Sequence, residues 1–376
     1  MNANWTRRQF LQTSGVALIG AMLPAVATRA ASPRVSARAA NLYRHAFVLD
    51  CNTLASIGSL CCGKDTPDEL EAVRESGVGA LKSTLGGGNG TFEAAVADIA
   101  AADGLVERYP KMFIKVHGYR DLERARAENR IAVIYSFEAA TMLDGKVERI
   151  DLFRNLGVRV MQLSYNHKSP FGVGCLDGET GGVTDLGRKA IARMNKLGVA
   201  LDLSHANTQT TADGIAISEK PPVFTHAGCR AVFMHPRNKR DEEMKALAKK
   251  GGVMGIYMLP FLTPDNRQPH LSDYMRHMVH ALKVCGEDHV GIGTDTMFFT
   301  VTEKDLMEVK QEVAERRKTG IGAPGENRPP YLPDVNTPRK LEYVADALLR
   351  HGYNERVVDK VLGLNFRRVF KRIWQA

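Results

Sequence analysis

The sequence predicts an α/β protein, a (β/α)8 TIM barrel extended by extra C-terminal helices. Short apolar runs alternate with segments of helical periodicity along most of the chain, as parallel βα units require. The length of 376 residues accommodates one barrel of about 250 residues with extensions. Several apolar runs are followed at once by a polar residue, which is where barrel strands deliver side chains to an active-site rim.

The N-terminus is typical of an export signal. Residues 6–11 read TRRQFL, a twin-arginine motif, and the apolar run 15–26 and small residues up to position 31 follow it. This run is too short and glycine-rich to form a bilayer-spanning helix of about 20 residues, so no stable membrane span is expected. We therefore expect a signal peptide at 1–31, a linker at 32–45 and one barrel domain at 46–376, in a protein that is periplasmic or otherwise exported.

The net charge of +9 does not predict a nucleic-acid partner. Residues 1–49 hold six arginines and no acid, so the remainder carries 45 basic and 42 acidic residues. A basic run at 367–372 alternates with apolar residues, which is typical of a solvated helix face. The six cysteines show no small-domain disulfide framework, and we expect at most one bridge.

Apolar periodicity and capping residues give the element order of the first half. Strands are predicted at 47–51, 77–84, 131–137 and 158–163, and helices at 67–76, 91–109, 122–129 and 147–156. The apolar run 112–116 is a surplus strand candidate, set aside because no polar residue suited to catalysis follows it. The glycine cluster 86–90 lacks the spacing of a phosphate loop and is interpreted as an active-site loop.

The second half continues the alternation. Strands are predicted to lead to His205, to His226, through 252–258 and to Asp295, with helices at 185–197, 208–218, 241–249 and 272–285. A Gly/Pro-rich loop is expected at 320–338, near the C-terminal face of the barrel. Closing helices at 338–351, 354–362 and 365–374 are expected to pack outside the barrel.

Three strand ends carry metal-binding side chains. The runs VALDLSH and PPVFTH end in His205 and His226, and IAVIYSFE ends in Glu138. A histidine at a strand end is by itself more often a hydrogen-bonded rim residue than a ligand. Two imidazoles and a carboxylate from separate strands nevertheless match a catalytic zinc site, in which three protein ligands leave one position open.

Two further residues are candidates for catalysis or binding. Asp295 follows the last strand and could accept a proton from an attacking water, or could instead cap a helix or pair with a lysine. Arg237, in HPRN, could hold a substrate carboxylate with its planar fork, or could be a surface arginine after a proline turn.

These motifs resemble a known family. DLSH, THAGCRAV with HPRN, SFEAA, MQLSYN, IGTD and GLNFRRVF are similar to the membrane (renal) dipeptidase family of amidohydrolase-superfamily metallopeptidases, from about Phe47 to Phe370. The resemblance implies a barrel of the amidohydrolase type and bound zinc. It also implies hydrolysis of dipeptides with a free C-terminal carboxylate, often with tolerance of a D-residue there.

The resemblance assigns a role to each matching residue. Glu138 matches the carboxylate that bridges two zinc ions, and His205 and His226 match the ligands of the second zinc. Arg237 matches the residue that binds the substrate carboxylate, and Asp295 the acid that handles the proton of the nucleophilic water. Tyr165 stands where many members have a histidine that polarises the scissile carbonyl, and a phenol could donate the same hydrogen bond.

The first strand departs from the family pattern. Its His-x-Asp motif, which supplies the first zinc, is replaced here by Asn52-Thr53-Leu54. Leucine cannot bind a metal and an amide is a poor zinc ligand, so one zinc is expected and the second is in doubt. A replacement ligand for the first zinc could come from Asp50, Cys51, Cys61 or Cys62.

Two hypotheses follow for the function. The first is an exported hydrolase with one zinc that cleaves dipeptides or related small amides, with Asp295 moving the proton, Tyr165 or zinc stabilising the oxyanion and Arg237 holding the carboxylate. The second is a catalytically impaired barrel that binds a peptide ligand or assists maturation of a secreted peptide. The expected partner is a small peptide, and a homodimer is the oligomer considered.

Overall fold

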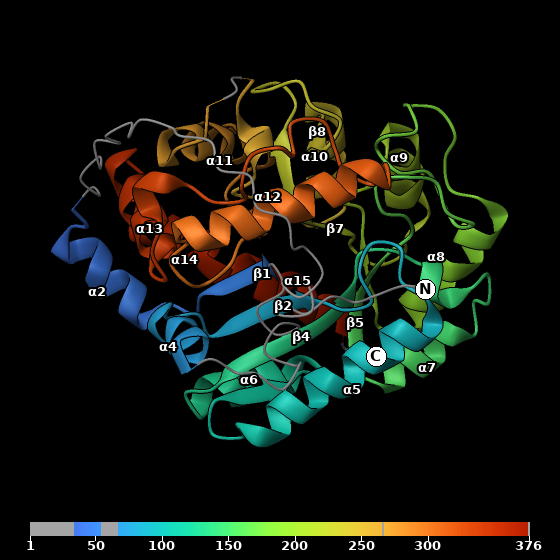
Figure 1. The fold of residues 1–376 in the computed structure, drawn as a ribbon, viewed down its shortest axis with the longest axis horizontal. Helices are drawn as coiled ribbons and strands as arrows, with labels where there is room; N and C mark the ends of the chain where they lie inside the picture. Colours follow the sequence, from blue (N-terminus) through green and yellow to red (C-terminus); the bar gives the residue numbers. More distant parts are fainter. Residues whose placement is uncertain (1–33, 54–66, 265–266, 375–376) are drawn as a thin grey trace, which may run out of the picture.

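Eight parallel strands close into a barrel in the computed structural model, which describes residues 34–53, 67–264 and 267–374 (Figure 1). Each strand pairs with the next, and the ring closes because β10 pairs with β1. The predicted fold class is thus confirmed. In ring order the strands are β1 (Leu49–Thr53), β2 (Ala80–Thr84), β4 (Ile131–Phe137), β5 (Val158–Gln162), β6 (Ala200–Asp202), β7 (Val223–Cys229), β9 (Val253–Ile256) and β10 (Val290–Ile292).

The surplus strand candidate does form a strand, β3 (Phe113–Lys115), but outside the ring. It pairs with the first half of β4, from Phe113 opposite Ile131 to Lys115 opposite Val133. Strand β5 takes the same edge of β4 from Tyr135 onward. The two strands therefore share one edge, and β3 adds no side chain to the carboxyl-terminal rim. A short strand, β8 (Asn238–Lys239), pairs only with β7.

The helices between strands begin and end close to the predicted positions because their caps are strong sequence signals. The side chains of Thr91, Thr184 and Asn207 accept hydrogen bonds from the first turns of three helices. Gly198, with φ 67°, ends α8 in the left-handed conformation. The helices are α4 (Pro67–Glu75), α5 (Phe92–Arg108), α6 (Tyr119–Ala127), α7 (Arg149–Asn155), α8 (Asp185–Leu197), α9 (Thr208–Ile217), α10 (Asp241–Lys249) and α11 (Leu271–Cys285).

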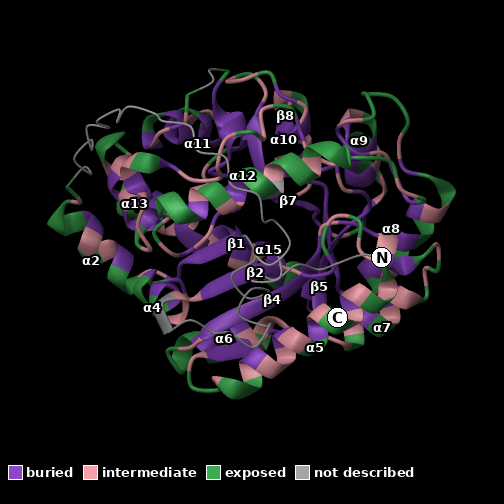
Figure 2. Ribbon diagram, viewed as in Figure 1, coloured by how far each residue is buried: buried purple, intermediate pink, exposed green. Residues whose placement is uncertain are grey.

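The barrel interior is a small apolar core sealed at one end by the last helix, α15 (Asn365–Trp374). Small and branched residues from seven strands face inward, and Phe366, Val369, Phe370 and Ile373 of α15 pack against them. Arg368 of α15 donates to backbone carbonyls just before β9 and β10, which places the helix at the amino-terminal end of the barrel. The closing helices were predicted to pack outside the barrel, and α15 does so across its amino-terminal end. Figure 2 shows the strands almost entirely buried.

The predicted linker at 32–45 contains a packed helix, α2 (Ala37–His45). Ala39 and Tyr43 are buried on its inner face, and the Tyr43 hydroxyl donates to Ser76 O at 2.7 Å. The Ser36 N–H donates to Asp346 of α13 (Lys340–Arg350) at 2.9 Å. The sequence analysis did not predict this helix, because its buried residues Ala39 and Tyr43 form only a narrow apolar face, at i and i+4, on a polar segment.

A helix that the sequence analysis did not predict, α12 (Glu303–Lys318), crosses in front of the open end of the barrel (Figure 1). The loop after it contains a short 3-10 helix, Pro333–Val335, and leads into α13. The second closing helix is shorter than predicted, because α14 (Glu355–Asp359) passes into a wider turn at Lys360–Leu364. The proposed signal peptide lies outside the described residues, and no described helix is both long and apolar enough to cross a bilayer.

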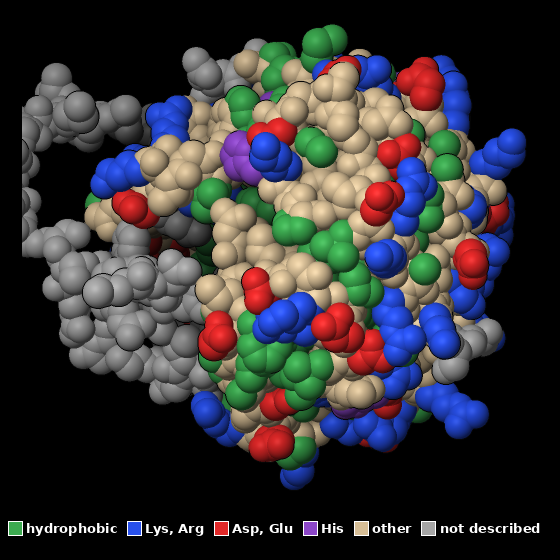
Figure 3. Space-filling view, turned by 90° about the vertical axis from the view of Figure 1, so that its right-hand side faces the viewer, with side chains coloured by type: hydrophobic (Ala, Val, Ile, Leu, Met, Phe, Trp, Pro, Cys, Tyr) green, Lys and Arg blue, Asp and Glu red, His purple; other side chains and the backbone are tan. Residues whose placement is uncertain are grey.

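Charges of both signs are mixed on the surface. On the face drawn in Figure 3, lysine and arginine side chains lie among aspartate and glutamate side chains. On α15, Arg367 is paired with Glu123 while the apolar side of the helix is buried, as predicted for a solvated basic face. The four cysteines of the described part, Cys51, Cys175, Cys229 and Cys285, are free and buried.

Candidate metal centre

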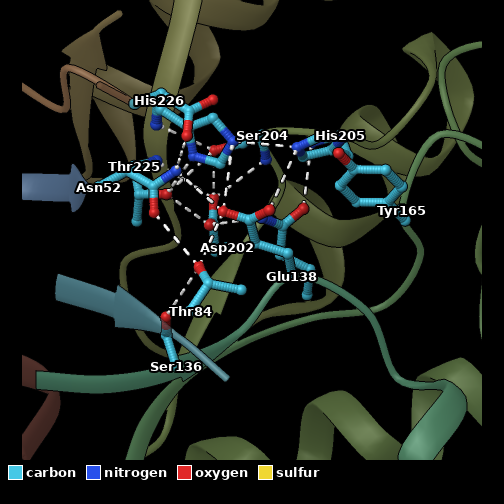
Figure 4. A network of polar contacts seen from close by, with 12 residues as sticks. Asn52, Thr84, Ser136, Glu138, Tyr165, Asp202, Ser204, His205, Thr225 and His226 are labelled. Carbon is cyan, nitrogen blue, oxygen red and sulfur yellow. Dashed lines mark hydrogen bonds and ion pairs between the residues drawn. The ribbon is translucent and has the colours of Figure 1, made fainter. Parts of the chain in front are cut away.

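Glu138, His205 and His226 converge at the carboxyl-terminal end of the barrel (Figure 4). Their ligand atoms all lie within 4.8 Å of one another. The two Nε2 atoms are 3.0 Å apart, and Glu138 lies 3.9 Å from His205 and 3.8 Å from His226. In the part of the chain that the structure describes, these three residues form the one group of three or more His, Cys, Asp or Glu side chains that could hold a metal ion. The three predicted ligands are therefore brought together.

The local backbone explains how the two histidines reach the site. His205 follows β6 by three residues, whereas His226 lies inside β7 and not at its end as predicted. The register between β7 and β9 shifts between Phe224 and Ala227, and His226 lies within this interval. Such an irregularity re-aims a side chain, which places His226 on the inner rim.

A hydrogen-bond relay fixes the tautomer of His226. The Thr225 hydroxyl donates its one proton to Asp202 Oδ2 at 2.6 Å, since a carboxylate can only accept. Toward His226 Nδ1, at 2.9 Å, the same hydroxyl oxygen must therefore accept. The proton of the ring thus resides on Nδ1, and Nε2 presents a lone pair to the site.

His205 is fixed in the same tautomer from two sides. Its Nδ1 lies 2.7 Å from Asn166 Oδ1, and the amide of Asn166 is oriented by its own donation to Ile321 O at 2.8 Å. On the other side, Arg237 Nη2 donates to His205 Nε2 at 3.0 Å. Because a guanidinium can only donate, Nε2 must carry the lone pair.

Two unprotonated imidazole nitrogens therefore face each other, and this arrangement fits a cation. Burial lowers the pKa of both His205 and His226 well below the usual value, with a further contribution from the positive charge of Arg237. Neutral imidazole is the form that binds metals. Two lone pairs 3.0 Å apart repel unless a positive charge lies near them, and Arg237 supplies one beside His205. A metal ion held by both rings would supply another, and the carboxylate of Glu138 completes a three-ligand set.

Asp202 is a supporting residue that the sequence analysis missed. It is buried and accepts hydrogen bonds from Gln162 of β5, from Ser204 and from Thr225 of β7. These bonds join three neighbouring strands beneath the histidines. A carboxylate that orients a ligand through another group is typical of metal centres.

Asp295 lies beside the cluster but does not belong to it. Its backbone has φ 55°, a left-handed conformation that aspartate tolerates better than most residues. Burial, and next the negative charge of Glu138, raise the pKa of Asp295 to about 7. A carboxyl group with a pKa near neutrality is suited to accept and return a proton.

The first-strand position holds Asn52, whose amide nitrogen lies 2.8 Å from Glu138 Oε1 and 2.9 Å from Asp295 Oδ1. Leu54 and the replacement ligands Cys61 and Cys62 lie outside the described residues. Of the other two, Asp50 accepts from the backbone and hydroxyl of Thr294 at 2.8 and 2.6 Å. Burial raises the pKa of the Cys51 thiol well above its usual value, which disfavours the thiolate that metals bind.

Arg237 is brought to the site, but its fork is already engaged. The side chain is 2% exposed, and its Nη1 donates to Ser204 O at 2.6 Å. With Nη2 bound to His205, the guanidinium is a fixed positive charge within the wall of the site and not a surface arginine.

Tyr165 covers His205. The two rings stack at 4.1 Å with 25° between their planes, and the phenol oxygen accepts a hydrogen bond from Arg316 of α12 at 3.1 Å. Burial raises the pKa of Tyr165 to about 12, so the hydroxyl keeps its proton at neutral pH. The predicted active-site loop touches this ring, because a Cβ at Gly88 would lie 2.7 Å from Tyr165.

Sequence comparison matches residues 59–315 to the model of the membrane dipeptidase family, peptidase family M19. The chain belongs to the membrane dipeptidase family. A curated relative from Klebsiella pneumoniae, named "Uncharacterized protein in pqqA 5'region", is 30% identical over 265 residues, which cover 68% of this chain and 87% of the relative.

Solved structures share the fold of this chain. An amidohydrolase from Pseudomonas aeruginosa is 28% identical with a TM-score of 0.74, covering 90% of this chain and 99% of that one. A metallopeptidase from Rhodobacter sphaeroides, bound to a phosphinate mimic of the dipeptide L-Ala-D-Ala, has the same fold at 22% identity, with a TM-score of 0.70 over 87% and 99% of the two chains. Membership of this family implies a metal-dependent hydrolase of the dipeptidase type, and the three-ligand cluster supplies a place for the metal.

Proposed function

We propose that this protein is an exported dipeptidase that hydrolyses the amide bond of dipeptides or related small peptides with one zinc ion. The observation that supports it most strongly is the pair of unprotonated Nε2 atoms 3.0 Å apart, with Glu138 within 4 Å of each. When bound, zinc would polarise a carbonyl oxygen and acidify water. Glu138, His205 and His226 are the residues that would hold it.

Asp295 is proposed to move the proton. It is nearly buried at the rim, beside Asn52, and a pKa of about 7 lets it take a proton from water and return it to the leaving amine. Its 2.9 Å hydrogen bond to the Asn52 amide holds one carboxylate oxygen in place.

Arg237 and Tyr165 are proposed to contact the substrate. Arg237 provides a fixed guanidinium next to His205. Because Nη1 and Nη2 each donate one proton to Ser204 and His205, the guanidinium would attract the free carboxylate of a dipeptide through its charge and its remaining N–H groups. The Tyr165 hydroxyl accepts from Arg316, so its own proton is available to donate to a carbonyl oxygen that gains negative charge. The dipeptide mimic bound to the Rhodobacter sphaeroides metallopeptidase supports testing D-alanine at the C-terminal position.

Export through the twin-arginine route is part of this proposal, supported by the motif TRRQFL at residues 6–11. Replacing both arginines of this motif by lysine should leave the protein in the cytoplasm of a bacterial host. Fractionation of cells that express the tagged full-length chain would show this, and unchanged secretion would contradict the proposal.

The function itself is tested with a dipeptide panel and metal analysis. The purified protein, loaded with zinc, is incubated with dipeptides that carry L- or D-residues at the C-terminal position, and free amino acids are quantified. We expect turnover with about one zinc per chain, and loss of turnover in His205→Ala and Asp295→Asn. Binding of dipeptides without any product in the zinc-loaded protein would refute the dipeptidase and favour a ligand-binding barrel.

A further inference from the structure

Lys82 is a buried cation on β2 that the reaction above does not use. Its side chain is 0% exposed and projects from β2 toward the same rim as Glu138. The ammonium donates to Ser136 Oγ at 2.9 Å and to Thr84 Oγ1 at 3.3 Å. Among the described residues, the carboxylate nearest to the Lys82 ammonium is that of Glu138, with Oε1 4.0 Å from Nζ. Burying an ammonium is costly unless a negative charge compensates it, so this position calls for a role.

Glu138 has one oxygen surrounded by donors. Its Oε1 accepts from Asn52 Nδ2 at 2.8 Å and from Thr84 Oγ1 at 2.9 Å, with the Lys82 ammonium 4.0 Å away. Its Oε2 is the oxygen nearer to His205, at 3.9 Å. Oε1 thus lies between these donors and His226, whose Nε2 is 3.8 Å away, while Oε2 lies toward His205.

Asn52 lies between two carboxylates. Its amide nitrogen reaches Glu138 and Asp295 at 2.8 and 2.9 Å, so one NH2 group contacts both acids. A cation placed between two carboxylates makes the same pair of contacts. The amide supplies the geometry of such a cation but no net charge, and Lys82 supplies the missing charge.

We propose that Asn52 and Lys82 together replace a metal ion in the first position of this site. The Asn52 amide joins Glu138 to Asp295, and the Lys82 ammonium compensates their negative charge and repels a second divalent cation. This inference rests on the proposed function with one zinc ion, and it explains why that function uses one metal ion and not two. Lys82 is in this view a positioning residue, since it acts through Glu138 and Asp295.

A set of four proteins tests the inference by metal stoichiometry: the unaltered chain, Asn52→Asp, Lys82→Met, and the double variant. Each is stripped with chelator and titrated with Zn²⁺, followed by elemental analysis after gel filtration and by calorimetry. We expect about one zinc in the first three proteins. The double variant, with a third carboxylate and no ammonium, is expected to bind about two. Lys82→Met alone should bind its single zinc at least about tenfold more tightly, because a nearby positive charge has been removed.

Lys340→Met is the matched control, because Lys340 is also a buried lysine but bonds to Met297 O, and the carboxylate that affects its pKa is Asp50. It should keep one zinc of unchanged affinity. If the folded double variant still binds one zinc, or if Asn52→Asp alone binds two, Lys82 does not exclude the second metal and the inference is wrong. Two zinc ions in the unaltered chain would overturn the one-metal function as well. One zinc without dipeptide hydrolysis would refute the function and leave the inference standing.

Discussion

Replacement of Thr225 by valine tests whether the relay behind His226 prepares it for metal binding. Valine keeps the shape of the side chain and removes only the hydroxyl that accepts from His226 Nδ1 and donates to Asp202. Asp202 keeps its other donors, from Gln162, Ser204 and the Thr225 backbone, at 2.9, 3.0 and 3.1 Å. The barrel is therefore expected to fold, while the His226 ring loses the group that places its proton on Nδ1.

The size of the effect follows from the bonds removed. Loss of a supporting hydrogen bond to a ligand typically costs 10–100-fold in metal affinity, or about 1.4–2.7 kcal/mol. Separately, loss of the hydrogen bond to the charged Asp202 should lower the free energy of unfolding of the metal-free protein by ~1.5–3 kcal/mol. Affinity is measured by competition between the protein and a fluorescent zinc chelator, and stability by urea unfolding of the metal-free protein.

Thr211→Val is the control for a buried threonine whose hydroxyl makes no hydrogen bond to a ligand side chain. Its hydroxyl contacts Ala206 O and the Lys239 ammonium, so the variant should lose stability and keep its zinc affinity. If Thr225→Val binds zinc as tightly as the unaltered chain, the hydroxyl does not set the tautomer of His226. The metal centre would then be organised differently from the way described here.

Three further changes probe other parts of the molecule. Because the pKa of Asp295 is raised to about 7, hydrolysis should increase with pH up to about that value. In the metal-free protein the same raised pKa contributes stability at acidic pH that is lost as pH rises through 7, so Asp295→Asn should lessen the fall in melting temperature between pH 4 and 8. If the melting temperature of Asp295→Asn fell between pH 4 and 8 as much as that of the unaltered chain, the effect would belong to another group. Tyr165→Phe keeps the ring on His205 but removes the proposed donor, and should lower kcat by about 10²–10³ with metal content unchanged, whereas an unaltered kcat would exclude that role. Tyr43→Ala should cost about 3–5 kcal/mol of unfolding free energy, measured by denaturant titration, since Tyr43 is 2% exposed, and a cost below 1 kcal/mol would show that α2 is dispensable.

The barrel and its three ligands were predictable because each depends on a local signal. Apolar runs bounded by capped helices gave the strands, and Glu138, His205 and His226 follow or lie within such runs. The ring itself brings carboxyl-terminal strand ends together, so residues 67 positions apart in the chain, such as Glu138 and His205, did not need a long-range signal to be placed side by side.

Supporting residues gave weaker signals. Asp202 lies between apolar residues in VALDLSH and was passed over because its partners come from two other strands. Lys82 looks like an interruption of a strand, and only the alternation of Ala80, Lys82 and Thr84 shows that it faces inward. Arg316 belongs to α12, whose sequence is polar on nearly every side and carries little helical periodicity.

The sealing of the barrel by α15 has a consequence for biosynthesis. The inward-facing residues of β1, β6 and β9 have no cover at the amino-terminal end until Phe366 and Phe370 are in place. A nascent chain emerging from the ribosome therefore carries an open apolar floor until its final helix has been translated. During that interval chaperones should bind it, and premature termination before residue 365 should yield aggregates in place of a weakened enzyme.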